Sequence, residues 1–299
     1  MASDLTRYAW LSIAAALATI LLKGLAWWLT GSVGLLSDAL ESLVNLAGAT
    51  MALWMLTLAA QPPDTRHAFG HGKAEYFSSA FEGGLILLAA LGIAWTAVER
   101  LLEPRPLDDV GIGLAVSAVA SAINFAVARV LLRVGREQHS ITLEADAHHL
   151  LTDVWTSAGV MLGVGAVVVT GWLWLDPAIA LLVAGNIVFT GWRLMHRSAE
   201  GLMDASLPAA DVDRIEAALA EFRARGIDFH ALRTRQAGNR GFDTLHVRVP
   251  GQWSVREGHD CCECIEAAIR KALPRAHVTT HLEPLGDPVS MVDQGLDRH

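Results

Sequence analysis

The sequence predicts two parts of different fold class: an all-α transmembrane bundle of six helices over residues 1–207, and a small α+β domain over residues 208–285, followed by a tail at 286–299. Hydrophobic residues make up 53% of the 299 residues, against about 45–50% in a typical soluble domain. Nearly all the long apolar runs precede residue 200, and charges recur throughout the chain after residue 205. This change in composition predicts a domain boundary near Leu207-Pro208.

Six apolar runs have the roughly 20 residues that a helix needs to cross a bilayer. The first run is too long for the core of a cleaved signal peptide, so we interpret it as a spanning helix. Turn-forming residues separate several runs, namely Gly31 after the first, Pro104 and Pro106 after the third, and Gly171 after the fifth. The predicted spans are residues 8–30, 34–59, 77–101, 110–134, 144–170 and 175–195.

The charges between the spans predict how the chain is oriented in the membrane. Positive residues collect in the loops on one side, which the positive-inside rule assigns to the cytoplasm. The opposite side has Arg100 and Arg105, which nearby acidic residues outweigh. We therefore expect both termini and the α+β domain to be cytoplasmic. The cytoplasmic set is Arg7, Arg66, Lys73, Arg133, Arg136, Arg193 and Arg197.

The C-terminal part alternates apolar and polar residues in three segments and shows helical spacing in two others. The predicted order is αββαβ, a small open-faced α+β sandwich. Its elements are a helix at 209–225, strands at 229–236 and 242–249, a helix at 254–273 and a strand at 276–283. The net charge of −8 gives no reason to expect nucleic-acid binding.

Two similar stretches in the predicted bundle carry polar residues at matched spacing. The first, SDALESLVN, places Asp38, Glu41 and Asn45 on one face of a helix, and the second, ADAHHLLTD, does the same with Asp146, His149 and Asp153. Ionisable residues inside a membrane are costly and usually functional.

Four of these residues form a candidate metal site, because Glu41, Asn45, His149 and Asp153 offer four ligand groups from two helices. Two carboxylates and two neutral donors sum to a charge of −2, which balances a dication. The alternative interpretation is polar hydrogen bonding between helices. Asp38 and Asp146 precede the ligand turns and are predicted to support them, with a helix N-cap or a proton relay as other roles.

A loop with the sequence QPPDTRHAFGHGKAE follows the second predicted span. Its residues Asp64, His67 and His71 step by three and four positions, so they can converge on one ion. The alternative is an ordinary solvated loop.

The α+β domain has an unusual density of histidines near the ends of its elements. Adjacent strands can bring several imidazoles and a carboxylate together, which predicts metal sites. His277 is expected to be a bystander. The candidate ligands are His230, His246, His259, His281 and Glu283.

Three cysteines and one glutamate remain without a firm role. Cys261, Cys262 and Cys264 are bunched on one predicted helix, which argues against a disulfide scaffold and suits a reducing compartment. One or two of them are expected to pack as small apolar residues, and a thiolate ligand beside His259 is the alternative. Glu82 lies within the third predicted span and has no assigned role.

The chain resembles the cation diffusion facilitator family, and within it the bacterial ferrous-iron and zinc efflux pumps. The most specific pieces are His149-x-x-x-Asp153, FGHGKAE at 69–75, LRTRQAG at 232–238 and THLEP at 280–284. The resemblance implies a six-helix homodimer in the bacterial inner membrane, with a ferredoxin- or metallochaperone-like cytoplasmic domain. It also implies that the protein is a transporter and not an enzyme, and exchanges cytoplasmic divalent metal for protons.

The resemblance also implies roles for the candidate residues. The four intramembrane ligands look like the transport site, the three loop residues look like a second site, and the histidines of the α+β domain with Glu283 look like a cytoplasmic binuclear site. Lys73 and Asp204 resemble a charge pair that links the two domains. Glu41 and Asn45 depart from the family pattern, because close relatives have Asp or a His/Asp pair there.

The departure at Asn45 affects the expected cargo, because an amide offers a neutral oxygen in place of an anion. Ligation mainly by oxygen atoms favours Fe²⁺, Mn²⁺ or Co²⁺ over strict Zn²⁺ selectivity. Cd²⁺ is a further candidate. The rival functions are a membrane-tethered metal sensor or storage protein and a metal-uptake carrier. An intramembrane metalloenzyme is disfavoured because the sequence lacks a His-Glu-x-x-His motif.

Overall fold

The computed structural model describes residues 5–30, 33–103, 110–172 and 174–291. Within these ranges, the side chains of some residues in the helices, Asp38 and Glu41 among them, lie outside the described part. The chain divides into two compact units, Met1–Ala199 and Glu200–His299.

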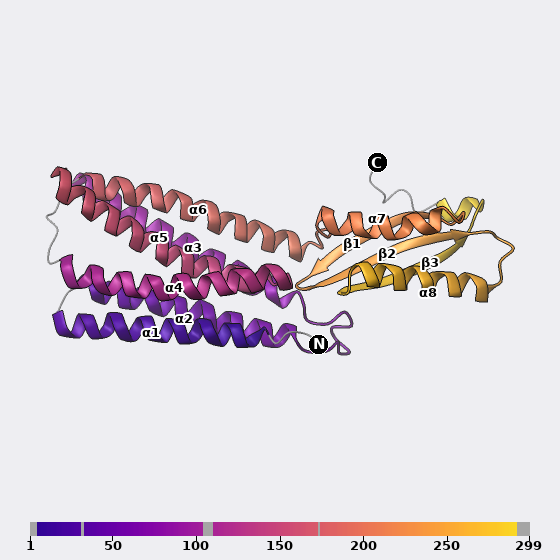
Figure 1. Ribbon diagram of the computed structural model, residues 1–299, viewed down its shortest axis with the longest axis horizontal. Helices are drawn as coiled ribbons and strands as arrows, with labels where there is room; N and C mark the ends of the chain where they lie inside the picture. Colours follow the sequence, from indigo (N-terminus) through magenta and orange to yellow (C-terminus); the bar gives the residue numbers. More distant parts are fainter. Residues whose placement is uncertain (1–4, 31–32, 104–109, 173, 292–299) are drawn as a thin grey trace. The chain divides into compact units, whose positions relative to one another are not determined.

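The first unit consists of long helices that lie side by side (Figure 1). Among the described residues, four segments are long and apolar enough to cross a membrane: Thr6–Ala26, Ala74–Leu102, Ala115–Gln138 and Pro177–Leu202. The helical transmembrane class is therefore confirmed, whereas a total of six spans stays a prediction. The helices are α1 (Thr6–Thr30), α2 (Val33–Ala59), α3 (Ala74–Leu102), α4 (Val110–Gln138), α5 (Ile141–Thr170) and α6 (Leu175–Leu202).

Small and branched apolar side chains fill the space between the helices. Ala9 of α1, Ala128 and Leu131 of α4, and Leu143 of α5 are completely buried in one cluster. Large apolar side chains point outward instead, and Trp95 is 77% exposed. A bilayer would cover this apolar exterior, while the helices satisfy their own backbone hydrogen bonds.

A buried carboxylate joins the beginnings of α3 and α5. The Ser140 hydroxyl donates a hydrogen bond to a side-chain oxygen of Glu75, and the Thr142 hydroxyl donates to the Glu75 backbone oxygen at 3.1 Å. The end of α6 meets the same two helices, because Ser198 donates to Ser79 of α3 at 2.9 Å and Arg197 donates to Glu144 of α5 at 2.7 Å. The starts of α3 and α5 therefore lie together at one end of the bundle.

The second unit is an α+β domain with a three-stranded sheet, in the predicted order αββαβ. Strand β1 pairs antiparallel with β2, and β2 pairs parallel with β3. Ser254 and Glu257 form a capping box that begins α8. The elements are α7 (Ala209–Arg223), β1 (Asp228–Ala237), β2 (Arg240–Val249), α8 (Val255–Ala272) and β3 (Ala276–Pro284).

One face of this sheet carries the core of the second unit. Leu245 and Val247 of β2 are fully buried in one cluster with Ile215 of α7 and Ile265 of α8. Successive side chains of a strand alternate between faces, so His246 projects from the other face. Both helices pack on the first face, and we call the other face, which neither α7 nor α8 covers, the open face. This face can present ligands.

Candidate functional site

A buried polar cluster joins α2, α4 and α5 inside the first unit. Asn45 of α2 donates a hydrogen bond from its side-chain nitrogen to Asp153 Oδ2 of α5, and Asn124 of α4 donates to the same oxygen at 3.0 Å. His149 is 6% exposed and lies one helical turn before Asp153. The structure thus brings two of the predicted ligands into contact, with the third beside them. The Glu41 side chain lies outside the described part of the chain.

Asn124 is a member of this cluster that sequence reasoning missed. It is 2% exposed and is an amide within the apolar segment ASAINFAVARV. A polar side chain in a transmembrane helix usually finds a partner on another helix, and this signal could have identified it. Its amide holds one oxygen of Asp153 in a fixed position.

Asp146 lies next to this cluster, toward the beginning of α5. It accepts a hydrogen bond from the Ser12 hydroxyl of α1 at 2.9 Å and is 2% exposed. Because α5 begins at Ile141, Asp146 is inside the helix and is not its N-cap. Its predicted counterpart Asp38 is also within a helix, but its side chain lies outside the described part.

The loop between α2 and α3 folds around the Asp64 carboxylate. One oxygen of Asp64 lies 3.3 Å from His67 Nδ1, and the other lies 3.4 Å from His71 Nε2. The backbone N–H groups of Arg66 and His67 donate to Asp64 at 2.8 and 2.7 Å. These backbone hydrogen bonds, that from His67 first, lower the pKa of Asp64 and favour the carboxylate that a metal needs. One donor atom from each of the three residues lies within 4.8 Å of the others.

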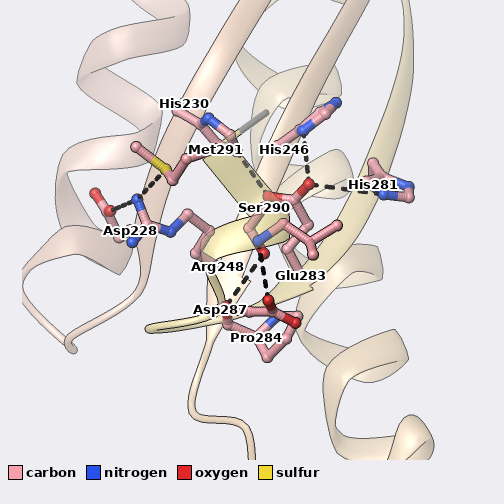
Figure 2. Close-up of polar contacts among 11 residues, drawn as sticks. Asp228, His230, His246, Arg248, His281, Glu283, Pro284, Asp287, Ser290 and Met291 are labelled. Carbon is pink, nitrogen blue, oxygen red and sulfur yellow. Dashed lines mark hydrogen bonds and ion pairs between the residues drawn. The ribbon is translucent and has the colours of Figure 1, made fainter. Parts of the chain in front are cut away.

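A second convergent cluster lies on the open face of the sheet (Figure 2). Glu283 stands between two histidines: its Oε2 lies 2.7 Å from His230 Nε2, and its Oε1 lies 3.1 Å from His246 Nδ1. One donor atom from each residue lies within 4.8 Å of the others. His281 Nε2 is 3.8 Å from Glu283 Oε1, and its side chain is 66% exposed. The arrangement offers two imidazoles and a carboxylate, with His281 at its rim.

Strand register explains why these residues meet. His246 of β2 is directly opposite His230 of β1 and His281 of β3. Glu283 follows His281 by two residues, so it projects from the same face. His259 lies instead near the start of α8, is exposed, and is not in the convergent group. The reason is that α8 packs on the opposite face of the sheet.

His277, the predicted bystander, and the three cysteines are not in the convergent group. His277 packs edge-on against the Phe242 ring, with the ring centroids 5.7 Å apart. Cys262 belongs to the buried core, and Cys261 packs against it, whereas Cys264 is exposed. Burial raises the pKa of the Cys261 and Cys262 thiols, which disfavours the thiolate form.

The open face also carries an arginine that the sequence did not single out. Arg248 is two residues from His246 on β2, and its guanidinium lies 3.0 Å from Asp228 and donates to Met291 Sδ at 3.4 Å. Figure 2 shows the Met291 side chain beside this arginine. The chain after β3 therefore returns to the face that carries the histidines.

The predicted charge pair between Lys73 and Asp204 spans the two units. Lys73 directly precedes α3 in the first unit. Asp204, in the second unit, has a positive φ of 61° and accepts a hydrogen bond from Arg235 at 3.2 Å. The link between Lys73 and Asp204 stays a prediction.

Comparison with protein families matches both parts of the chain. The model of the cation efflux transmembrane domain matches residues 9–203, and that of the cation efflux protein cytoplasmic domain matches residues 207–285. The latter family is a dimerisation domain, which indicates a homodimer.

Individual relatives cover nearly the whole chain. An uncharacterized transporter of Synechocystis, sll1263, is 55% identical over 283 residues, which are 95% of this chain and 91% of the relative. The cation-efflux pump FieF of Salmonella arizonae is 30% identical over 280 residues, which are 93% and 92% of the two chains. A solved structure of CzrB in its zinc form is 41% identical and covers 27% of this chain and 93% of its own, with a TM-score of 0.26.

The two family matches, the full-length relatives and the helical transmembrane unit followed by an α+β domain all agree. The chain belongs to the cation diffusion facilitator family of metal efflux transporters.

Proposed function

We propose that this protein exports a divalent transition-metal ion from the cytoplasm in exchange for protons. The observation that carries the proposal is the meeting of Asn45 and Asp153 between α2 and α5, where both side chains are buried inside the helical bundle. The cargo is Zn²⁺ or Fe²⁺, with Mn²⁺, Co²⁺ and Cd²⁺ as alternatives. The chain has both termini in the cytoplasm and acts as a homodimer in the bacterial inner membrane.

The donor set supports this cargo. Asp153 supplies an anion, buried His149 an imidazole, and Asn45 a neutral amide oxygen. Glu41 stands one turn before Asn45 on the same helix and completes the proposed ligand set. A single imidazole among oxygen donors suits first-row divalent ions and does not select Zn²⁺ alone.

Proton exchange follows from the chemistry of these ligands. A carboxylate must lose its proton, and histidine must be neutral, before either can bind metal. Protons that arrive from outside the cell then compete with the ion for Glu41, His149 and Asp153. In an alternating-access cycle, α2 and α5 carry the site while the other helices move against them.

The loop cluster and the sheet cluster are proposed to bind metal on the cytoplasmic side. Both gather carboxylate and imidazole donors within 4.8 Å. The sheet cluster belongs to the dimerisation domain, so metal bound by His230, His246 and Glu283, with His281 as a further ligand, would favour one arrangement of the dimer. The proposed Lys73–Asp204 pair would pass this arrangement to the transmembrane helices.

Transport into vesicles tests the proposal. The purified protein is reconstituted in proteoliposomes with an imposed pH gradient, and uptake of Zn²⁺, Fe²⁺, Mn²⁺, Co²⁺ and Cd²⁺ is measured. We expect Asp153→Asn to abolish transport and Asn45→Asp to change the selectivity and the pH dependence.

The rival functions give different results in the same assay. Metal binding without transport by the wild type would indicate a sensor or storage protein. Flux in the direction of the proton gradient would indicate an uptake carrier. Normal transport by Asp153→Asn would refute the proposed site.

A further inference from the structure

Two buried carboxylates beside the proposed transport site have an oxygen without a partner. Glu82 of α3 is 0% exposed; its Oε1 accepts a hydrogen bond from Ser78 at 3.4 Å, and its Oε2 has no hydrogen-bond partner in the described part of the chain. Asp146 Oδ2 and His149 Nδ1 are buried and lack a partner in the same way. Such groups are costly to bury unless something compensates them.

These three residues face a common region. The ideal position of a Cβ on Gly48 of α2 lies 3.7 Å from Glu82 Cγ and 3.8 Å from His149 Nδ1. Asp146 lies three residues before His149 on the same face of α5. The side chains of Glu82 and His149 therefore both approach Gly48, and Asp146 projects from α5 toward the same part of the bundle.

The position along the helices places this region next to the proposed transport site. Glu75 contacts Ser140 and Thr142, so α3 and α5 begin at the same level. At about 1.5 Å per residue, Glu82 lies about 10 Å into α3, and Asp153 lies about 16 Å beyond Thr142 in α5. Glu82 is thus level with the turn from Asp146 to His149. All three residues are closer than Asp153 to the end of the bundle where the Asp64 loop joins α3.

We propose that Glu82 and Asp146 form a second binding subsite for the divalent cation, through which the ion passes between the loop end of the bundle and the Asn45–Asp153 pair. The subsite rests on the proposed function, since it extends the same transport path. Two carboxylates that share His149 with the deeper site let the ion move without losing all its protein ligands. Oxygen donors and one imidazole are suitable for Zn²⁺, Fe²⁺, Mn²⁺ or Co²⁺.

The test compares the metal-concentration dependence of transport for Glu82→Gln and the wild type, with Zn²⁺ as the probe in proteoliposomes. Glutamine keeps the shape of the side chain and removes its charge. We expect KM to rise about tenfold or more, in line with the effect of perturbing a metal site, while the maximal rate falls much less. Glu82→Asp, which retains the carboxylate, should recover most of the affinity.

Glu99→Gln is the matched control, because Glu99 is an exposed glutamate on the same helix, and its KM should not change. An unchanged KM in Glu82→Gln, or a loss confined to the maximal rate, would overturn the subsite while Asp153→Asn still abolished transport. If Asp153→Asn also transported normally, the proposed function itself would fail. If Glu82→Gln does not purify as a dimer, Asp146→Asn is tested in its place. The same changes in KM and maximal rate are then expected.

Discussion

The bundle cluster and the sheet cluster use similar donors but are built differently. In the sheet, one donor atom from each of His230, His246 and Glu283 lies within 4.8 Å of the others, so the proposed ligands already lie together in the metal-free protein. In the bundle, Asp153 is instead tied to two amides, and His149 Nδ1 has no partner in the described part of the chain. We therefore expect the sheet cluster to keep a metal ion bound and the bundle cluster to bind and release one during transport.

Backbone geometry accounts for this difference. Neighbouring strands are about 4.8 Å apart and paired residue by residue, so His230, His246 and His281 stand in one row. Helices of a bundle lie about 8–10 Å apart, and their side chains must reach across that gap. Small shifts between helices would therefore change the bundle cluster more than the sheet cluster.

Among the changes that compare the two clusters, the largest expected effect comes from removing an amide that holds Asp153. We expect Asn124→Leu to lower the rate of metal transport about 10–100-fold, because supporting residues of metal sites usually contribute that much. Transport into proteoliposomes measures it. Asn186→Leu, at an exposed position of α6, serves as the control. If Asn124→Leu transported normally, the hydrogen bond from Asn124 to Asp153 would not be needed for transport. It would then not explain a difference between the bundle cluster and the sheet cluster.

We expect Glu283→Gln to reduce transport less than Asn124→Leu does, but to weaken Zn²⁺ binding clearly. This change removes the anion that stands between His230 and His246, so the affinity of one Zn²⁺ site per chain should fall about tenfold or more. Calorimetric titration of the purified protein measures the affinity. The exposed Glu263→Gln on α8 is the matched control. Equal loss of transport and binding would mean that the two clusters do not act separately.

The smallest effect concerns the opposite face of the same sheet, where a buried carboxylate has no ligand role. Asp243 is 0% exposed, and neither of its oxygens has a hydrogen-bond partner in the described part of the chain. Burial, with a contribution from the nearby Asp211, raises the pKa of Asp243 from 3.8 to about 6. The folded state therefore holds this proton more tightly than the unfolded state, and stability falls as the pH rises from about 4 to 6.

Asp243→Asn should remove this penalty. We expect it to stabilise the domain by about 1–2 kcal/mol at pH 8, allowing for some hydration of the site, with the gain shrinking below pH 6. Hydrogen–deuterium exchange of β2 in the full-length protein, corrected for the intrinsic effect of pH, measures the change. The exposed Asp213→Asn is the control. A gain that is independent of pH would show that the charge is not its cause.

Sequence patterns predicted the residues whose position depends on backbone periodicity. The alternation of strands was enough to expect His230, His246 and Glu283 together, and the spacing of Asp64, His67 and His71 was enough for the loop. His259 could not be placed in this way, because nothing in its local pattern tells which face of the sheet α8 covers.

Contacts between helices were harder to predict. The pattern indicated that Asn45 and Asp153 belong to one site, but not that Asn124 of α4 would join them. The sequence also gave no signal for Glu82 beyond its charge, because its approach to Gly48, which His149 also approaches, depends on how α2, α3 and α5 pack. These contacts depend on rotation of each helix about its axis, which hydrophobic periodicity constrains only broadly.

The return of the chain to Arg248 through Met291 has a practical consequence for purification. A polyhistidine tag on the C-terminal side of Met291 would bring extra imidazoles toward the face that carries Glu283 and compete for any added metal. Titrations of this protein should therefore use a tag at the other end or remove it by proteolysis.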